Sequence, residues 1–532
     1  MVRFVKCGLL SLAGICLFIS SYAQDAVAQK YAAYIDAADA RKHLSVLSSD
    51  AFEGRETGKP GAAKAAKYIA EQFKAMGLKG PVNGSYFEDV PLTESSFRIK
   101  TSLVNKKPFT FGKDFYITGT PVSASVSANQ VVFVGYGITS DNYDDLKNTN
   151  IAGKVVLVIN SGEPVQNGIS AVTKTKDLSD WTYIRYKRIK FLQSKKPALI
   201  LAASPVVNQY LAEDANYFTS PKLAIKGKKS DIDNNVPVIN ITTDLADRIL
   251  ASSGKTYNDL KTAIDNTLSP KTQVIKTGIS FAFEQKLKDV HAADVLGYLE
   301  GSDLKNEVVV FSAHYDHIGL NPDGPDKVNN GADDDGSGTT AIIEIARAFT
   351  QAKKEGHGPR RSILFLSNVG EEKGLLGSEY YTDFNPIIPL ERIVTDLNID
   401  MIGRVDPAHY KNPDYCYLIG SDKLSTELHQ ISEKANATYT RLTIDYKYND
   451  PNDPEQIYYR SDHYNFAKHN IPIIFYFNGV HEDYHKPGDE ISKIHFDLLV
   501  KRAQLVFYTG WEVANRDKRL VVDVKSDMRP ER

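Results

Sequence analysis

The stretch Val308-Val309-Val310-Phe311-Ser312-Ala313-His314-Tyr315-Asp316 decides the fold, because an apolar run passes directly into polar residues. The run predicts a strand, and further strands are expected at residues 362–366, 393–397 and 473–477. Helices are expected between and after them, at residues 339–349, near 378 and at 495–514. Alternation of this kind predicts an α/β domain with a largely parallel, mixed sheet and helices on both faces.

Polar side chains follow the predicted strands. Ligands of such sheets gather beyond the carboxyl ends of the strands, so we expect these side chains to converge. Two imidazoles and three carboxylates form a donor set that suits a pair of divalent ions such as zinc. The five candidate metal ligands are His314, Asp333, Glu372, Asp400 and His485. We therefore predict a two-metal site that activates water for hydrolysis.

Adjacent acids mark two of the motifs. Three neighbouring aspartates, residues 333–335, precede a predicted helix, and their charges repel unless cations neutralise them. Glu371 and Glu372 follow a strand, and neighbouring side chains need not point the same way. One can bind metal while the other takes a proton from water. We assign Glu372 as the ligand and Glu371 as the general base, although spacing alone does not order them.

The context of the other candidates supports the same site. Asp316 lies two residues after His314 and is suited to accept a hydrogen bond from its imidazole, as metal-bound histidines require. Asp400 ends a predicted buried strand, where an acid needs a charged partner. A helix cap is the competing role for Asp400, and an ordinary surface histidine is the competing interpretation of His485.

The length and the net charge of the chain limit its possible domain organisation and partners. The chain has 532 residues, which favours two domains and an export segment over one core. Its formal net charge of −2 provides no field that would attract nucleic acid or an anionic membrane. We therefore expect a peptide substrate, no nucleic acid and no stable membrane insertion. The sequence does not indicate an oligomeric state.

The first residues resemble a signal peptide. Arg3 and Lys6 precede an apolar stretch, residues 7–19, and a small-residue cleavage pattern ends at Ala23. We predict a signal peptide at residues 1–23 and a periplasmic or secreted mature protein. A lipoprotein attached through Cys16 is the less favoured alternative. Cleavage would leave Cys416 as the only cysteine, which excludes an intrachain disulfide and zinc bound by thiolates.

The middle of the chain has a different pattern. Strand-like runs at residues 130–134, 154–159 and 198–202 alternate with polar loops, and no metal motif lies among them. We interpret residues 106–275 as a smaller, β-rich inserted domain. The main domain would then comprise residues 30–105 and 276–520. The segment from Phe52 to Gly61, which contains Glu53 and Arg55, is expected to be a surface turn.

The metal motifs as a set resemble the co-catalytic zinc peptidases, which include bacterial leucyl-type aminopeptidases and glutamate carboxypeptidase. The segments that carry the resemblance are Ala313–Asp316, Gly331–Asp334, Glu371–Glu372, Asp400–Met401 and Tyr484–His485. The resemblance covers about residues 30–515. It implies two zinc ions bridged by Asp333, with His314 and Asp400 on one ion and Glu372 and His485 on the other.

The resemblance carries three further expectations. It implies a cis peptide bond between Asp333 and Asp334. It implies that Tyr484 donates a hydrogen bond to the developing oxyanion. The middle region resembles a protease-associated domain, through residues 134–137 and 150–156, and such a domain could restrict substrate entry.

Several functions remain open on the sequence. We favour an exported aminopeptidase, and a dipeptidyl or glutamate-type carboxypeptidase on the same core is the alternative. A receptor-like binding protein and a single-zinc glutaminyl cyclase are remote alternatives, because every expected ligand and both adjacent glutamates are present. A carboxypeptidase needs arginines for the substrate carboxylate. Arg404, Arg441 and Arg460 are available, but the sequence does not place them.

Overall fold

The structure is a computed structural model that describes residues 25–184, 186–229, 232–322 and 324–528. The expected signal peptide, residues 1–23, lies outside the described residues. Within the described part of the chain, no helix is both long enough and apolar enough to cross a bilayer.

A large mixed sheet forms the main body. Its strands lie in the order β10-β1-β13-β15-β14-β16-β19-β17-β18. The central strands β15, β14, β16 and β19 are parallel, as predicted, and the flanking pairs include antiparallel ones. The bounds are β10 Lys222–Ile225, β1 Phe87–Val104, β13 Ile279–Leu299, β15 Arg361–Asn368, β14 Leu304–His314, β16 Ile393–Ile399, β19 Ile473–Phe477, β17 Tyr415–Ile419 and β18 Thr443–Asp445.

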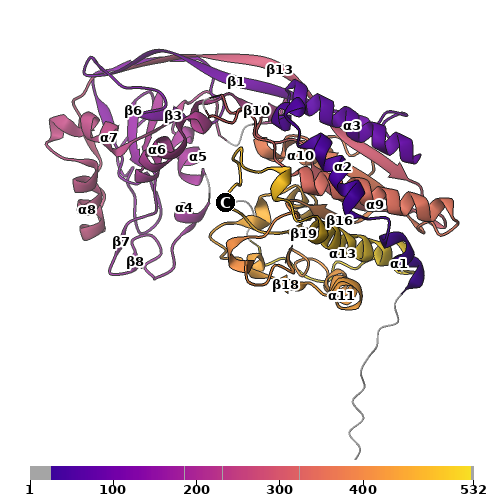
Figure 1. Ribbon diagram of the computed structural model, residues 1–532. Coiled ribbons are helices and arrows are strands. Elements are labelled where there is room, and N and C mark those ends of the chain that lie inside the picture. Colours follow the sequence, from indigo (N-terminus) through magenta and orange to yellow (C-terminus); the bar gives the residue numbers. More distant parts are fainter. Residues whose placement is uncertain (1–24, 185, 230–231, 323, 529–532) are drawn as a thin grey trace, which may run out of the picture.

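Apolar residues cover both faces of this sheet. In β14, Val309 and Phe311 belong to one buried cluster, whereas Val308 and Val310 belong to another on the opposite face. The first face packs against α1 (Ala26–Ala32), α2 (Ala37–Leu47), α3 (Pro60–Met76), α9 (Gly336–Lys354), α11 (Thr426–Ala435) and α13 (Phe496–Asn515). The second face is covered by α12 (His463–Ala467) and by loop residues. The predicted three-layer α/β arrangement is confirmed (Figure 1).

A long pair of antiparallel strands leads from the main body to a second sheet. Strands β1 and β13 pair from Phe87 opposite Val295 to Val104 opposite Ile279, and this two-stranded ribbon arches over the molecule (Figure 1). The second sheet has the order β12-β5-β6-β9-β11-β3. Its strands are β12 Gln273–Ile275, β5 Val131–Phe133, β6 Val155–Ile159, β9 Leu199–Ala203, β11 Val238–Ile241 and β3 Phe115–Ile117.

The second sheet lies within the segment that we interpreted as an inserted domain. Its strands β5, β6, β9 and β11 are parallel, and parallel neighbours need crossover connections, so helices accompany them. These helices are α4 Asp180–Tyr183, α5 Lys187–Ser194, α6 Pro205–Thr219, α7 Thr243–Leu250 and α8 Tyr257–Thr267. The region is therefore α/β and contains more helix than the sequence suggested.

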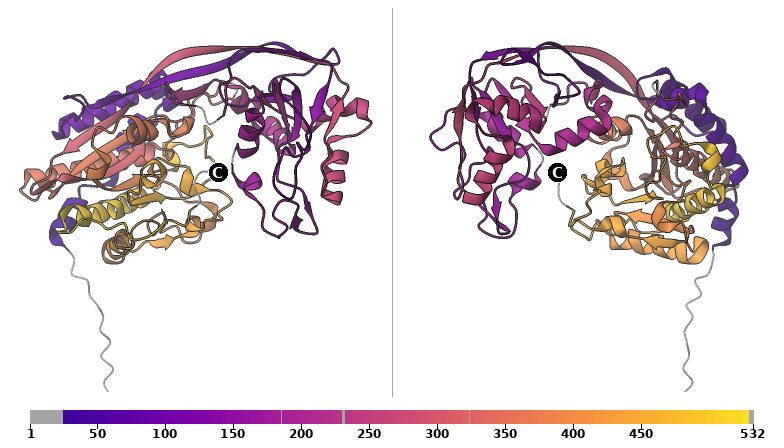
Figure 2. Two further views of the ribbon diagram at one scale, coloured as in Figure 1. Left: turned by 180° about the vertical axis from the view of Figure 1, so that it is seen from behind. Right: turned by 60° about the vertical axis from the view of Figure 1, so that its left-hand side comes forward.

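One strand of the middle segment returns to the large sheet. Strand β10 pairs with Leu92–Ser95 of β1, although residues 106–275 were assigned to the insertion. The second sheet and the main body lie side by side beneath the β1–β13 ribbon (Figure 2), and β10 forms the edge of the large sheet next to β1.

Candidate metal centre

The polar motifs lie at one edge of the large sheet. His314 is the last residue of β14, and Asp400 directly follows β16. Glu371 and Glu372 begin the short helix η3 (Glu371–Lys373) after β15, and His485 lies in the loop after β19. Because these four strands are parallel, their carboxyl ends bring the side chains together.

Two groups of ligand atoms share one aspartate. The first comprises His314, Asp334 and Asp400, with His314 Nε2 3.4 Å from Asp334 Oδ1 and 3.6 Å from Asp400 Oδ1. The second is centred on Glu372, with His485 Nε2 3.1 Å from Asp334 Oδ2 and 3.0 Å from Glu372 Oε2. Asp334 is thus placed to contact two ions at once.

The position expected of Asp333 is occupied by Asp334. Asp333 Oδ1 accepts a hydrogen bond of 2.6 Å from the Gly403 amide, and its Oδ2 lies 3.2 Å from His481 Nε2. The third acid, Asp335, caps α9 by accepting from the Gly338 amide at 2.8 Å. The structure therefore places Asp334, and not Asp333, between the two groups of ligand atoms. The cis peptide bond is shifted in the same way and joins Asp334 to Asp335.

Asp316 has a different role from the one predicted. His314 Nδ1 contacts the backbone carbonyl of Asp316 at 3.1 Å, whereas the Asp316 carboxylate is 3.8 Å away. That carboxylate accepts hydrogen bonds from the Thr57 hydroxyl at 2.6 Å and from the Glu371 amide at 3.3 Å. Asp316 therefore orients His314 through its main chain and holds the loop that carries Glu371.

The sequence interpretation assigned no role to His317. Its side chain is fully buried, and its Nδ1 lies 2.9 Å from Glu372 Oε1 and 3.6 Å from Asp334 Oδ2. His317, Asp334 and Glu372 could together hold an ion. Its position three residues after His314, directly after a buried strand, was the sequence feature that could have indicated a role in the site.

The charged carboxylates of the centre favour the binding of cations. Burial would raise the pKa of Glu372, but interactions with His485 and His317 outweigh it and lower the pKa to about 2. Burial would lower the pKa of His485, but Glu372 and Asp334 raise it to about 11. Protons on histidines balance the carboxylates here, and metal ions could replace them.

The donor set fits a pair of zinc ions. Among the described residues, His314 Nε2 and Asp334 Oδ2 are buried and have no hydrogen-bond partner. A buried polar atom without a partner is costly, and coordination to an ion removes that cost. Imidazole nitrogens together with carboxylate oxygens are ligands that zinc prefers. The residues present therefore fit the two ions expected from the sequence.

Glu371 lies beside the shared carboxylates without being part of either group. Its Oε2 is 3.9 Å from His314 Nε2, and burial, together with the charges of Glu372 and Asp400, raises its pKa well above the usual range. A carboxylate whose pKa is raised is a stronger acceptor for a proton from water. This environment suits the expected general base.

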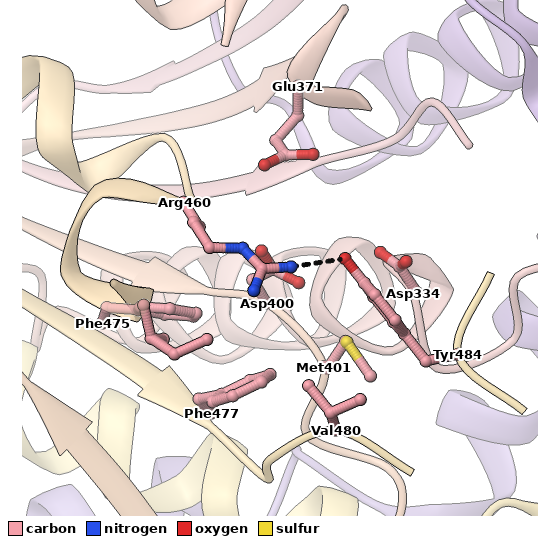
Figure 3. Close-up of a pocket in the computed structure, with 10 residues that line it drawn as sticks. Asp334, Glu371, Asp400, Met401, Arg460, Phe475, Phe477, Val480 and Tyr484 are labelled. Carbon is pink, nitrogen blue, oxygen red and sulfur yellow. Dashed lines mark hydrogen bonds between the residues drawn. The ribbon is translucent and has the colours of Figure 1, made fainter. Parts of the chain in front are cut away.

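A small cavity opens beside the centre (Figure 3). Its volume is about 30 Å³, and Asp334, Glu371 and Asp400 line it. Arg460 and Tyr484 form another part of the wall, where Arg460 Nη2 donates to Tyr484 Oη at 3.3 Å. The remaining wall is apolar and comprises Met401, Ile457, Phe475, Phe477 and Val480. Tyr484 thus lines the cavity together with Asp334, Glu371 and Asp400.

Arg404 and, in the consecutive residues Ser461-Asp462-His463, the serine and the histidine have structural partners. Arg404 Nη2 contacts Asp483 at 2.9 Å, so it is already paired. Ser461 Oγ donates to Asp400 Oδ2 at 2.7 Å, and His463 Nε2 contacts the Tyr458 carbonyl at 2.8 Å. Serine and histidine have separate partners, and the three residues do not form a nucleophilic triad.

Arg55 connects the loops that carry His314 and Asp334. It is 1% exposed, and its guanidinium donates to the carbonyl oxygens of Leu47, Tyr315, Asn330 and Gly331 at 2.6–2.8 Å. The expected surface turn is therefore a buried anchor that joins the His314 and Asp334 loops.

Comparison with known proteins identifies the same region. Residues 294–510 match Peptidase family M28. Leucine aminopeptidase 2 of Trichophyton equinum is 26% identical over 308 residues, covering 53% of this chain and 56% of the relative. Aminopeptidase YwaD of Bacillus subtilis is 25% identical over 235 residues, covering 42% and 46%. This chain thus spans about half the length of the curated relatives it matches.

A solved structure resembles most of the chain. The aminopeptidase from Aneurinibacillus sp. strain AM-1 has a TM-score of 0.57 and 16% sequence identity, covering 94% of this chain and 100% of that one. At this identity the likeness is one of fold.

Proposed function

We propose that the protein is a zinc-dependent aminopeptidase, because residues 294–510 match Peptidase family M28. The observation that carries the proposal is the sharing of Asp334 between two groups of ligand atoms, with Glu371 beside them. His314 and Asp400 would hold one ion, and Glu372 and His485 the other. His317 Nδ1 contacts Glu372 Oε1 and helps to hold this carboxylate in place.

The bound ions would polarise the peptide carbonyl and lower the pKa of water toward neutrality. Glu371 takes the proton of the attacking water and delivers it to the leaving amine, as its raised pKa allows. The Tyr484 hydroxyl faces the same cavity and donates a hydrogen bond to the carbonyl oxygen as that oxygen gains charge. The apolar wall around Phe475 and Phe477 accepts the side chain next to the cleaved bond.

The carboxylates also suit a free amino terminus. Asp400 and Glu371 both line the cavity and attract an ammonium group. The relatives named above are aminopeptidases, which supports this choice.

One observation favours the second candidate, a carboxypeptidase. Arg460 lines the cavity and donates to a neutral hydroxyl, so its charge remains available for a carboxylate. Free-amine and N-blocked peptides distinguish the two functions. An aminopeptidase cleaves only the former, a carboxypeptidase cleaves both, and a chelator abolishes either activity. Cleavage that persists after complete metal removal would contradict both proposals.

We also propose that residues 1–23 direct export and that the second sheet belongs to an inserted protease-associated domain. The basic and apolar pattern of the first residues supports export. The second sheet lies in the segment between the paired strands β1 and β13, which supports an insertion. N-terminal sequencing of protein from the cell envelope and the culture medium tests the first proposal. A mature chain that still begins at Met1 would refute it.

A further inference from the structure

A second and larger cavity lies on the side of the second sheet that faces β10. Its volume is about 840 Å³. The walls come from β3, from the loop after β6, from β11, from helices α4 to α6 and from the start of β10. These elements lie on the inner side of the second sheet, toward the main body (Figure 2). The cavity is many times larger than the one beside the metal centre.

A buried guanidinium lines this cavity. Arg188 is 6% exposed, and its hydrogen bonds among the described residues all go to neutral oxygens, namely the carbonyls of Gly162 and Trp181 and the side chain of Asn160. Within that part of the chain its Nε has no hydrogen-bond partner. Burial lowers the pKa of Arg188 to about 10, so the group remains charged at neutral pH. A buried cation without a carboxylate partner attracts an anion.

The nearest acids are occupied elsewhere. Glu163 accepts hydrogen bonds from the hydroxyls of Ser170, Ser179 and Thr182. Asp145 accepts from Tyr143 Oη at 2.8 Å and from the Ile138 amide at 3.2 Å. Their charges act on Arg188 from a distance, but neither carboxylate forms an ion pair with it within the described part of the chain.

A second cation lines the same cavity. Lys222, the first residue of β10, donates to the Tyr217 carbonyl, and its Nζ lies 4.0 Å from the centroid of the Tyr217 ring. Burial and the charge of Lys373 lower the pKa of Lys222. Lys373 directly follows Glu372, so this end of the cavity is close to the catalytic loop.

Aromatic rings form another part of the wall. Tyr210 and Tyr217 are 41% and 60% exposed, respectively, and both pack on Phe218, with ring centroids 4.9 Å and 5.0 Å apart. Trp181 lies in the wall beside Arg188. Exposed aromatic groups next to unpaired cations suit a ligand with both apolar groups and a carboxylate.

We propose that this cavity binds the carboxylate-bearing C-terminal part of the peptide whose amino terminus lies at the metal centre. The proposal rests on the proposed aminopeptidase function and adds a preference for short peptides with a free carboxyl terminus. Arg188 and Lys222 bind the terminal carboxylate, and the rings around Phe218 contact the neighbouring side chains. A nearby acidic side chain offers the same chemistry, and the experiment separates the two sources.

The first measurement compares peptides that begin with leucine and end in a free carboxylate or an amide. Their lengths run from about three to about eight residues, because each extended residue adds about 3.5 Å of reach. At one or more of these lengths the free acid should have a KM about tenfold below that of the amide, as charge-assisted hydrogen bonds predict. Equal KM values at every length would overturn the proposal.

Two further arms identify the group that is bound. Amidated peptides with glutamate as the last residue carry a side-chain carboxylate but no terminal one. They should behave as the other amides do, and a KM equal to that of the free acids would refute the assignment to the chain end. Lys222→Gln and Arg188→Met should each make the KM values for the free-acid and amidated peptides equal. Lys226→Gln, on the exposed residue after β10, is the matched control and should keep it.

A binding measurement separates this proposal from the catalytic one. Trp181 lines the cavity, so its fluorescence should change when the metal-free protein is titrated with a free-acid peptide. The Trp181→Phe variant should lose this change, and the amide should produce it only at about tenfold higher concentration. Failure to hydrolyse leucine p-nitroanilide would refute the proposed function, whereas equal titrations with acid and amide would refute only the cavity assignment.

Discussion

The Arg55 side chain donates a hydrogen bond of 2.8 Å from its Nε to the carbonyl oxygen of Tyr315, 260 residues further along the chain. Tyr315 follows His314, so the N-terminal segment fixes the backbone of a proposed ligand. The same guanidinium donates to Asn330 and Gly331, which precede Asp334. One buried side chain therefore sets the spacing between two motifs of the centre.

Replacing Arg55 by methionine should destabilise the fold. Several buried carbonyl oxygens would lose their donor, and hydrogen bonds to a charged group contribute about 1.5–3 kcal/mol each, so we expect a loss of about 3 kcal/mol or more. Urea denaturation measures the free energy of unfolding. Arg98→Met, at an exposed residue of β1, is the control and should change it by less than about 0.5 kcal/mol. Equal effects of the two substitutions would contradict the anchoring role.

The shift from Asp333 to Asp334 predicts unequal effects of two neighbouring substitutions. Asp334→Asn removes a negative charge shared by both groups of ligand atoms and should reduce zinc binding to fewer than two ions per chain. Asp333→Asn leaves those groups complete and should retain two ions per chain, because the Asp333 carboxylate faces the Gly403 amide and His481 instead. Metal analysis after dialysis measures both. The reverse order would restore the assignment made from the sequence.

Glu371→Gln should separate metal binding from turnover. Glutamine has a similar shape but cannot take a proton, and general-base catalysis contributes about 10²–10⁴-fold in rate. We therefore expect kcat to fall by about this factor while the zinc content stays at two ions. Steady-state kinetics with leucine p-nitroanilide and metal analysis of the same sample provide the two values. A variant with normal kcat would exclude Glu371 as the base.

His317→Gln tests the residue that the sequence interpretation missed. Loss of the contact with Glu372 should weaken metal affinity by about tenfold or more, as for other groups that hold a ligand in place. Competition with a chelator measures the affinity independently of activity. His291→Gln, on the exposed part of β13, is the control and should leave it unchanged. Normal affinity in the His317 variant would assign this histidine to packing alone.

A pair of buried acids predicts how stability depends on pH. Glu88 on β1 lies opposite Asp294 on β13, and burial raises the pKa of Glu88 to about 8. The unfolded chain has a pKa near about 4.3 at this residue, so folding takes up a proton between these values. This contribution to stability is fully present below the unfolded pKa and is lost as the pH rises through about 8.

Glu88→Gln should remove that loss. The slope for one proton is at most about 1.4 kcal/mol per pH unit, so between pH 5 and pH 8.5 the wild type should lose up to about 4 kcal/mol more stability than the variant. Thermal unfolding at intervals across that range measures the difference. Parallel curves for the two proteins would show that Glu88 ionises normally.

The strand ends were predictable because periodicity and polarity both change there. Val308 to Asp316 indicated a buried strand followed by functional residues, and the parallel order then brought His314, Glu372 and Asp400 together. The order within a run of identical acids was not predictable. Asp333, Asp334 and Asp335 differ in their partners only through backbone geometry, which composition does not encode.

Long-range contacts account for the other differences. Arg55 lies among glycines and polar residues, a composition that is typical of a surface turn, and only its distant carbonyl partners explain its burial. Strand β10 is four residues long and lies amid the middle segment, so no local pattern indicated that it pairs with β1. Tertiary contacts therefore determined what local propensity could not.

Cys416 lies buried in β17, and burial raises the pKa of its thiol to about 11, so it should react slowly with alkylating reagents at neutral pH. A chain that begins after the predicted cleavage site would thus accept nitroxide labels almost only at cysteines introduced by design. Such labels in place of Lys42 and Lys255, both on exposed positions, would allow electron paramagnetic resonance to measure the separation between the main body and the second sheet as peptide is added.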